Sequence, residues 1–155
     1  MTNRVNRFKE SVESVSGHCI VTTDVTDALN RIIADLKPKR IARSDDAPNA
    51  QDIFGYDVGI STAQAAIAET GTLVLDSACE RHRLVSLVPP VHIAVVNASA
   101  IVETLSEALA LLQQKEISPA ITFITGPSRT ADIELTLAIG VHGPQELYVI
   151  VDGSK

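Results

Sequence analysis

Apolar residues recur at helical spacing in two segments near the beginning of the chain. In the first segment these residues are Val5, Phe8, Val12 and Val15, and Gly17 ends it. In the second they are Val25, Leu29, Ile32, Ile33 and Leu36, with Pro38 beyond the end. Asp24 is placed to cap the second segment, because its carboxylate can accept bonds from the free amides of a first helical turn. The spacing predicts two amphipathic helices.

Short runs of aliphatic residues between these helices and beyond them predict strands. They cover residues 18–22, 40–43, 57–60, 72–75, 91–96, 120–125 and 146–151. Residues 67–75 predict a hairpin around Glu69, Thr70 and Gly71, so antiparallel pairing is expected in this region. Residues 62–66 are interpreted as a short turn of helix, and residues 44–52 as an exposed polar loop.

A third helix is predicted after the strand at 91–96. Its shared apolar face consists of Ile101, Leu105, Ala108, Leu109 and Leu112. Ser99 is expected to cap this helix, and Glu103 falls early, where the positive end of the helix dipole favours an acid.

The segment 126–140 gives two conflicting signals. Its residues alternate between apolar and polar, which by itself is a strand pattern. Its ends favour a helix, because Pro127 suits a first helical position and Gly140 suits a left-handed stop. We expect a helix that ends at Ile139, with its first turn opening into a crevice at the carboxyl edge of the sheet.

Strands that alternate with helices predict one α/β domain of three layers, in which a mostly parallel sheet carries helices on both faces. The 155 residues form an N-terminal helix, 1–17, and an α/β core, 18–152. Apolar residues make up 45% of the chain and aromatic residues only 3%, which is typical of an aliphatic core.

Composition and missing motifs exclude several classes of function. A net charge of −6 argues against nonspecific nucleic-acid binding. No apolar run has the length of a membrane span or the form of a signal peptide, so we expect a cytoplasmic location. Cys19 and Cys79 stand far apart and are interpreted as buried, reduced thiols. Neither a dinucleotide fingerprint, a P-loop nor metal-ligand spacing is present, so the cofactor stays unknown.

Four blocks of the sequence resemble the lactate-utilisation protein C family, the LUD domain. They are AIAETGTLVL at 66–75, LVPPVHIAVV at 87–96, GPSRTADIE at 126–134 and GVHGP at 140–144. The resemblance spans about residues 57–152 and implies a fold similar to the glucosamine-phosphate isomerase, ribose-phosphate isomerase and CoA-transferase group. It also implies a link to L-lactate oxidation alongside iron–sulfur partner subunits. Members of the family often carry a longer N-terminal helical portion than this chain has before His18.

Two groups of candidate site residues follow. In CoA-transferases, which the resemblance brings into comparison, a glutamate is the acyl nucleophile; Glu69 is the matching candidate here, with Thr70, Gly71 and Thr72 around it. The other interpretation of Glu69 is a turn residue that bonds local amides. Gly126, Ser128, Arg129, Thr130, Asp132 and Gly143 are candidates for an anion-binding corner. The alternative there is that the hydroxyls only cap a helix.

Histidines and arginines complete the set of candidates. His142 lies between glycines at an expected sheet edge, where it can act as an acid or a base. His92 falls inside a strand, where the alternative to a ligand-binding role is a core imidazole. Arg81 and Arg83 can clamp a carboxylate or a phosphate, and the alternative is that they are solvated surface charges. Because no redox motif is visible, we expect a non-redox binding or scaffold subunit with an anion-binding crevice. The alternative is an enzyme that acts through Glu69 on a CoA thioester, a sugar phosphate or a folate-like substrate.

Overall fold

The computed structural model describes residues 3–77, 80–114, 116, 118–130, 138–139 and 143–155. Its first sheet has five parallel strands in the order β1-β11-β6-β3-β2. They are β1 (His18–Thr22), β2 (Ile41–Arg43), β3 (Val58–Thr62), β6 (Val91–Asn97) and β11 (Glu146–Asp152). The longest pairing joins β11 to β6, from Glu146 opposite Val91 to Asp152 opposite Asn97. The parallel sheet and these strands are as the aliphatic runs predict.

One face of the first sheet is covered by helix α2 (Val25–Leu36). The side chain of Asp24 accepts a hydrogen bond of 2.9 Å from the amide of Asp27, which confirms the predicted cap. Ala28 and Ile32 pack on Ile93 and Ile150 of the central strands. The helical spacing in this segment therefore serves to cover the aliphatic strands on this face.

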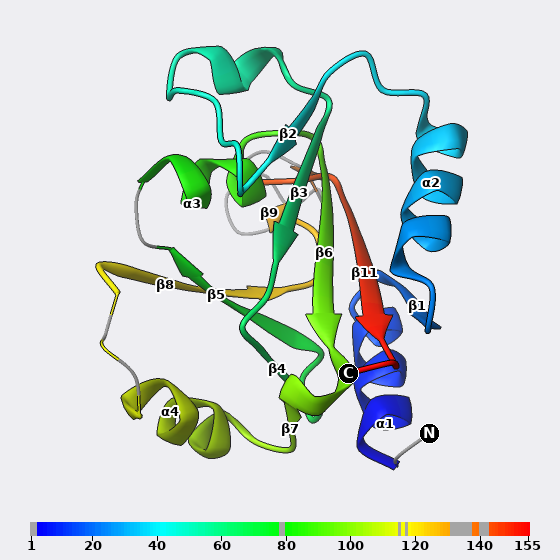
Figure 1. Cartoon of the computed structure of the whole chain (residues 1–155), viewed down its shortest axis with the longest axis vertical. Helices are drawn as coiled ribbons and strands as arrows, with labels where there is room; N and C mark the ends of the chain where they lie inside the picture. The colour runs from blue at the N-terminus through cyan, green and yellow to red at the C-terminus, as the bar shows by residue number, and fades with distance from the viewer. Residues whose placement is uncertain (1–2, 78–79, 115, 117, 131–137, 140–142) are drawn as a thin grey trace.

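The opposite face carries α1 (Asn3–Ser14), the short helix α3 (Glu80–Leu87) and a second sheet. Val5, Phe8 and Val12 of α1 are buried against strand residues that include Leu147 and Val149. Figure 1 shows the strands of the second sheet running across those of the first. The arrangement confirms a mostly parallel sheet with helices on both faces, and adds a second sheet to one of them.

The second sheet has the order β7-β4-β5-β8. Its strands are β4 (Ala65–Ile67), β5 (Thr72–Ser77), β7 (Ile101–Val102) and β8 (Ala120–Thr125). β4 and β5 form the predicted hairpin, and β8 pairs antiparallel with β5 along the edge. The predicted turn of helix at 62–66 is wrong, because the alanines there lie in β4 and close to it, among the buried residues of the two cores.

Helix α4 (Leu105–Gln113) packs on the outer face of the second sheet and begins later than its apolar pattern suggests. Thr104 is its cap, since its hydroxyl accepts a bond of 3.3 Å from the amide of Glu107. Ser99, the predicted cap, lies in the 3-10 turn η2 (Ala98–Ala100). Ile101 belongs to β7 instead, because it pairs with Ala66 and is buried in the core.

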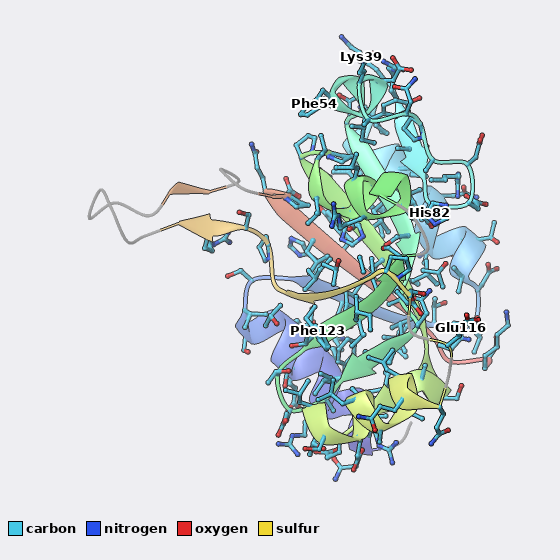
Figure 2. The ribbon with its side chains drawn as sticks, turned by 90° about the vertical axis from the view of Figure 1, so that its left-hand side faces the viewer. Lys39, Phe54, His82, Glu116 and Phe123 are labelled. Atoms are coloured by element: carbon cyan, nitrogen blue, oxygen red, sulfur yellow. The ribbon has the colours of Figure 1, made fainter. Side chains whose placement is uncertain are left out.

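The prediction of a helix that ends at Ile139 is wrong for both parts of this segment that the structure describes. β9 (Arg129–Thr130) and β10 (Ala138–Ile139) pair as antiparallel strands. The alternation of apolar and polar residues was therefore the better guide here. The amide of Ser128, which would head the first helical turn, donates instead to the carbonyl of Pro144 at 2.8 Å. Figure 2 shows this pair projecting from the body of the molecule.

The polar loop after β2 includes a short 3-10 helix, η1 (Asp52–Gly55). Within the described part of the chain, no helix has the length and apolar character that crossing a membrane requires. Cys19 is buried, and burial raises the pKa of its thiol to about 12, which agrees with an unreactive thiol. Cys79 lies outside the described residues.

Candidate functional site

An open crevice of about 630 Å³ lies where β8 ends, and we call it the β8 crevice. Its walls come from three places in the chain: the end of α1, the end of α3 and the segments on either side of the β9–β10 pair. They are formed by Val15, Ser16, Ser86, Leu87, residues 122–129, Gly143 and Pro144. Gly126, Ser128, Arg129 and Gly143, four of the residues predicted from sequence, thus line one crevice.

A tight turn at Gly126 shapes the floor of the crevice. Gly126 has a φ of +70°, a conformation that residues with a Cβ seldom adopt. A Cβ at this position would also lie 2.5 Å from the backbone oxygen of Val15. The end of β8 can approach the end of α1 this closely because residue 126 is glycine.

The walls on the two sides of the β9–β10 pair are held together by backbone contact. The amide of Ser128 donates to the carbonyl of Pro144 at 2.8 Å. A Cβ at Gly143 would touch the Cβ of Ser128 at 3.4 Å, so the two segments lie side by side. The Ser128 amide is therefore engaged, and a ligand would meet side-chain groups here rather than a row of free helix-terminal amides.

The described lining of the β8 crevice carries positive charge. Among the described residues that line it, Arg129 is the one with a charged side chain. Its guanidinium donates to the carbonyl of Ser128 at 3.1 Å and is exposed. Among the described residues, this bond uses one of five guanidinium N–H groups, and the other N–H groups can donate to an incoming carboxylate or phosphate. The hydroxyls of Ser16 and Ser128 add further hydrogen-bonding groups.

A chain of threonine hydroxyls connects the β4–β5 hairpin with the crevice. Thr70 and Thr72 are joined by a hydrogen bond of 2.7 Å between their hydroxyls. Thr72 is joined in the same way, at 2.7 Å, to Thr125, which lines the crevice. Thr70 and Thr72, both predicted as ligand-binding residues, thus reach the crevice through Thr125 rather than by lining it.

Glu69 lies at the start of α4 instead of in the crevice. One carboxylate oxygen accepts a bond of 3.3 Å from the amide of Leu105, and its own amide donates to the carbonyl of Glu103 at 3.1 Å. Gly71 faces α1, where an added Cβ would lie 2.6 Å from the amide nitrogen of Val12. The Glu69 carboxylate thus bonds an amide at the start of α4, 36 positions along the chain, rather than the amides of its own turn.

His92 is completely buried in β6 and is not among the residues that line the crevice. Its Nε2 is 2.7 Å from the hydroxyl of Ser61. Burial lowers the pKa of this histidine to about 4, because charging the ring inside the core would remove the hydration of the charge. The imidazole is therefore neutral at physiological pH and forms part of the core.

The remaining predicted residues are only partly described. Arg81 and Arg83 lie in α3, whose last residues, Ser86 and Leu87, line the crevice. Thr130 belongs to β9, and its backbone pairs with Ala138. Asp132 and His142 lie outside the described residues. No group of three or more metal-ligating side chains exists among the residues that the structure describes.

The predicted position of the crevice at the carboxyl edge of the parallel sheet is wrong. Gly143 and Pro144 lead into the amino end of β11, and the amide of Gln145 donates to the carbonyl of Pro90, just before β6. The crevice thus lies beside the amino ends of the parallel strands. The reason is that β8 pairs in the second sheet, antiparallel to β5, instead of extending the first sheet.

Four lining residues could not be inferred from the sequence. Val15 and Ser16 follow α1, and Ser86 and Leu87 end α3. Ser16 has a φ of +67°, so the chain reverses here just before β1. Nothing in their local sequence indicates a binding role, because only the packing of α1 and α3 beside β8 brings them to the crevice.

Comparisons with known proteins agree on one family. The family model of the LUD domain matches residues 30–151. Lactate utilization protein C of Bacillus licheniformis is 40% identical over 110 residues, covering 67% of this chain and 46% of that protein. An uncharacterized protein of Neisseria meningitidis is 38% identical over 119 residues, covering 76% of this chain and 51% of its own length. The chain thus spans about half the length of the curated relatives it matches.

A solved structure supports the same fold. The crystal structure of a DUF162 family protein from Deinococcus radiodurans has a TM-score of 0.72 and 21% sequence identity, and the match covers 97% of this chain and 96% of that one. The family match extends over most of the chain, from within α2 to β11, and includes β8 and the crevice residues other than Val15 and Ser16. This chain therefore belongs to the LUD domain family.

Proposed function

We propose that this chain is a component of a cytoplasmic lactate-utilisation system, in which it binds a small carboxylate or another small anion in the β8 crevice and carries no electrons itself. The observation that carries the anion site is the position of Arg129, the charged residue among the described lining residues, beside the hydroxyls of Ser16 and Ser128. The link to lactate comes from relatives named lactate utilization protein C.

The structure offers little support for the alternative of a glutamate-dependent enzyme. An acyl nucleophile must face its substrate. The Glu69 carboxylate instead accepts the amide of Leu105 at the start of α4, and Glu69 is absent from the described lining of the crevice. We therefore favour a binding or scaffold role alongside iron–sulfur subunits, which would carry the electrons.

Anion binding is tested by calorimetric titration of the purified chain with L-lactate, pyruvate and inorganic phosphate. We expect at least one of these anions to bind, and Arg129→Gln to weaken binding about tenfold or more, as loss of a charged hydrogen bond does. Arg31→Gln is the matched control, because Arg31 is an exposed arginine of α2 that pairs with Asp27. Equal anion affinities of Arg129→Gln and Arg31→Gln would refute the anion site, and so would failure of the unmodified chain to bind any of the three anions.

The role in lactate utilisation is tested separately in the native host. Deletion of the gene should impair growth on L-lactate, and the Arg129→Gln gene should restore growth less well than the Arg31→Gln gene. Normal growth of a clean deletion in a strain without a paralogue contradicts the role. Purification of the tagged chain from the host, followed by iron analysis, tests the iron–sulfur partners, and an iron-free preparation without co-purifying subunits would oppose them.

A further inference from the structure

A second, smaller hollow of about 180 Å³ lies at the carboxyl ends of β2 and β3, and we call it the polar hollow. Its lining includes Ser44, Asp45, Ser61, Gln64, Asp76 and His82, and it shares no residue with the β8 crevice. Figure 2 shows His82 on the side of the molecule away from the β9–β10 pair. The carboxyl ends of parallel strands are where open α/β folds commonly bind ligands.

Ser61 is oriented by the core histidine. Ser61 is buried in β3, and its hydroxyl lies 2.7 Å from Nε2 of His92. Nδ1 of His92 has no hydrogen-bond partner in the described part of the protein. A buried N–H without an acceptor is rarer than a buried acceptor without a donor, which favours the tautomer with its proton on Nε2. Nε2–H then donates to Ser61, whose own hydroxyl proton is left to donate elsewhere.

Asp76 provides an acceptor in the same lining. Its Oδ1 is shielded from solvent and has no hydrogen-bond partner in the described structure. Its amide donates to Oε1 of Gln64 at 2.6 Å, and Nε2 of Gln64 donates to the carbonyl of Thr62 at 3.0 Å. These bonds hold the backbone of Asp76 in place. A shielded carboxylate oxygen without a donor is costly, so a donor supplied to it would stabilise the fold.

Size and charge restrict what can bind in the polar hollow. A volume of 180 Å³ accommodates about six water-sized groups, each of about 30 Å³. Asp45 and Asp76 give the lining two carboxylates, which disfavour an anion. The β8 crevice, in contrast, carries the positive charge of Arg129. The two hollows therefore favour ligands of different charge.

We propose that the polar hollow binds a small molecule without negative charge. Its hydroxyl or amino groups donate hydrogen bonds to Asp76, and it accepts a hydrogen bond from Ser61. The shared chemistry is two or more hydrogen-bond donors on about four to eight heavy atoms. A short polyol and a short ammonium alcohol both have it. This site is separate from the proposed anion site and does not depend on it.

The test is a titration of the ¹⁵N-labelled full chain, followed by amide NMR, with erythritol, ethanolamine and L-lactate as probes. We expect erythritol or ethanolamine to shift the amides of Ser61, Gln64 and Asp76, with erythritol indicating a polyol and ethanolamine a cationic ligand. Asp76→Asn should weaken this binding about tenfold or more. Asp35→Asn, the same change at an exposed position of α2, should leave it unchanged.

Absence of shifts at these amides with both erythritol and ethanolamine overturns the proposal, and so does a stronger response to lactate there. Equal binding by Asp76→Asn and Asp35→Asn also overturns it. If Asp76→Asn does not fold, Asp45→Asn replaces it, because Asp45 is an exposed lining residue; a twofold or larger loss of ethanolamine binding is then expected, and no loss refutes the proposal. Arg129→Gln should not change binding here, which separates this result from the anion site.

Discussion

The two sheets of this protein differ in how far their strands are enclosed. The central strands of the first sheet, β6 and β11, have neighbours on both edges and are packed on both faces. Within the described part of the chain, β8 of the second sheet is paired with β5 alone, and Phe123 on it is 42% exposed. Buried aliphatic residues lie in β6, β11 and the inner strands of the second sheet, whereas the edge strand β8 has no fully buried residue and supplies walls of the β8 crevice. Stability and binding are thus concentrated in different parts of the fold.

The largest expected contrast compares two phenylalanines. Phe8→Ala removes a completely buried ring from between α1 and the first sheet and should lower the free energy of unfolding by about 3–5 kcal/mol. Phe123→Ala, at the exposed edge, should lower it by less than about 1 kcal/mol. Urea denaturation followed by circular dichroism measures both. Similar losses for the two variants would contradict the division between the enclosed core and the exposed edge strand β8.

A second test of the enclosed sheet uses pH. Burial lowers the pKa of His92 to about 4 in the folded chain, whereas the same ring titrates at 6.5 when unfolded. Between these values the unfolded chain binds more protons, so stability is full above about pH 6.5 and falls as the pH drops towards 4. The difference corresponds to roughly 3 kcal/mol. His92→Gln should flatten this part of the stability profile, and an unchanged slope in the variant would show that His92 is not its source.

The close packing of α3 on the first sheet is tested at Gly59. A Cβ there would lie 1.9 Å from the backbone oxygen of Val85, so Gly59→Ala must push α3 away from β3. We expect a loss of about 1–3 kcal/mol in the free energy of unfolding. Gly153→Ala is the control, because its nearest contact would be an ordinary 3.5 Å. Equal stability of the two variants would mean that α3 is not tightly packed.

The smallest effects are expected at the start of α4, on the second sheet. Thr104→Ala removes the cap of this helix and should cost about 1 kcal/mol. Glu69→Gln keeps an oxygen for the amide of Leu105 and should cost only a few tenths of a kcal/mol. Thermal melts of both variants measure these changes. If Glu69→Gln also abolishes growth on lactate at unchanged stability, Glu69 has a functional role beyond capping.

The sequence predicted the first sheet and α2 more successfully than the second sheet and the segments around it. The mostly apolar run from Val91 to Val96 directly indicates a buried strand. The helical spacing of apolar residues from Val25 to Leu36, with its local capping signal, directly indicates a helix. Ile101 illustrates the limit of this approach. It fits the apolar stripe of α4, yet it pairs with Ala66 in β7, a partner that only the folded chain provides. The helix expected up to Ile139 failed because end signals were given more weight than the alternation between them.

The sequence likewise predicted only part of the β8 crevice. Gly126, Ser128, Arg129 and Gly143 can be selected from the sequence because they lie in two of the blocks that resemble the LUD domain, and the structure brings them to one crevice. Val15, Ser16 and Ser86 could not be selected, because they reach the crevice only through the packing of α1 and α3. Ser61 and Asp76 are likewise inconspicuous in the sequence, although they share the polar hollow.

By itself, the sequence determined the family, the aliphatic parallel sheet and most of its helices, because periodicity and capping depend on neighbouring residues. Only the tertiary structure decided that β8 pairs with β5 in a second sheet, and thereby placed the crevice at the amino ends of β6 and β11. The physical reason is that strand pairing joins residues far apart in the chain. Its outcome depends on which edge and which face remain free once the other elements have packed.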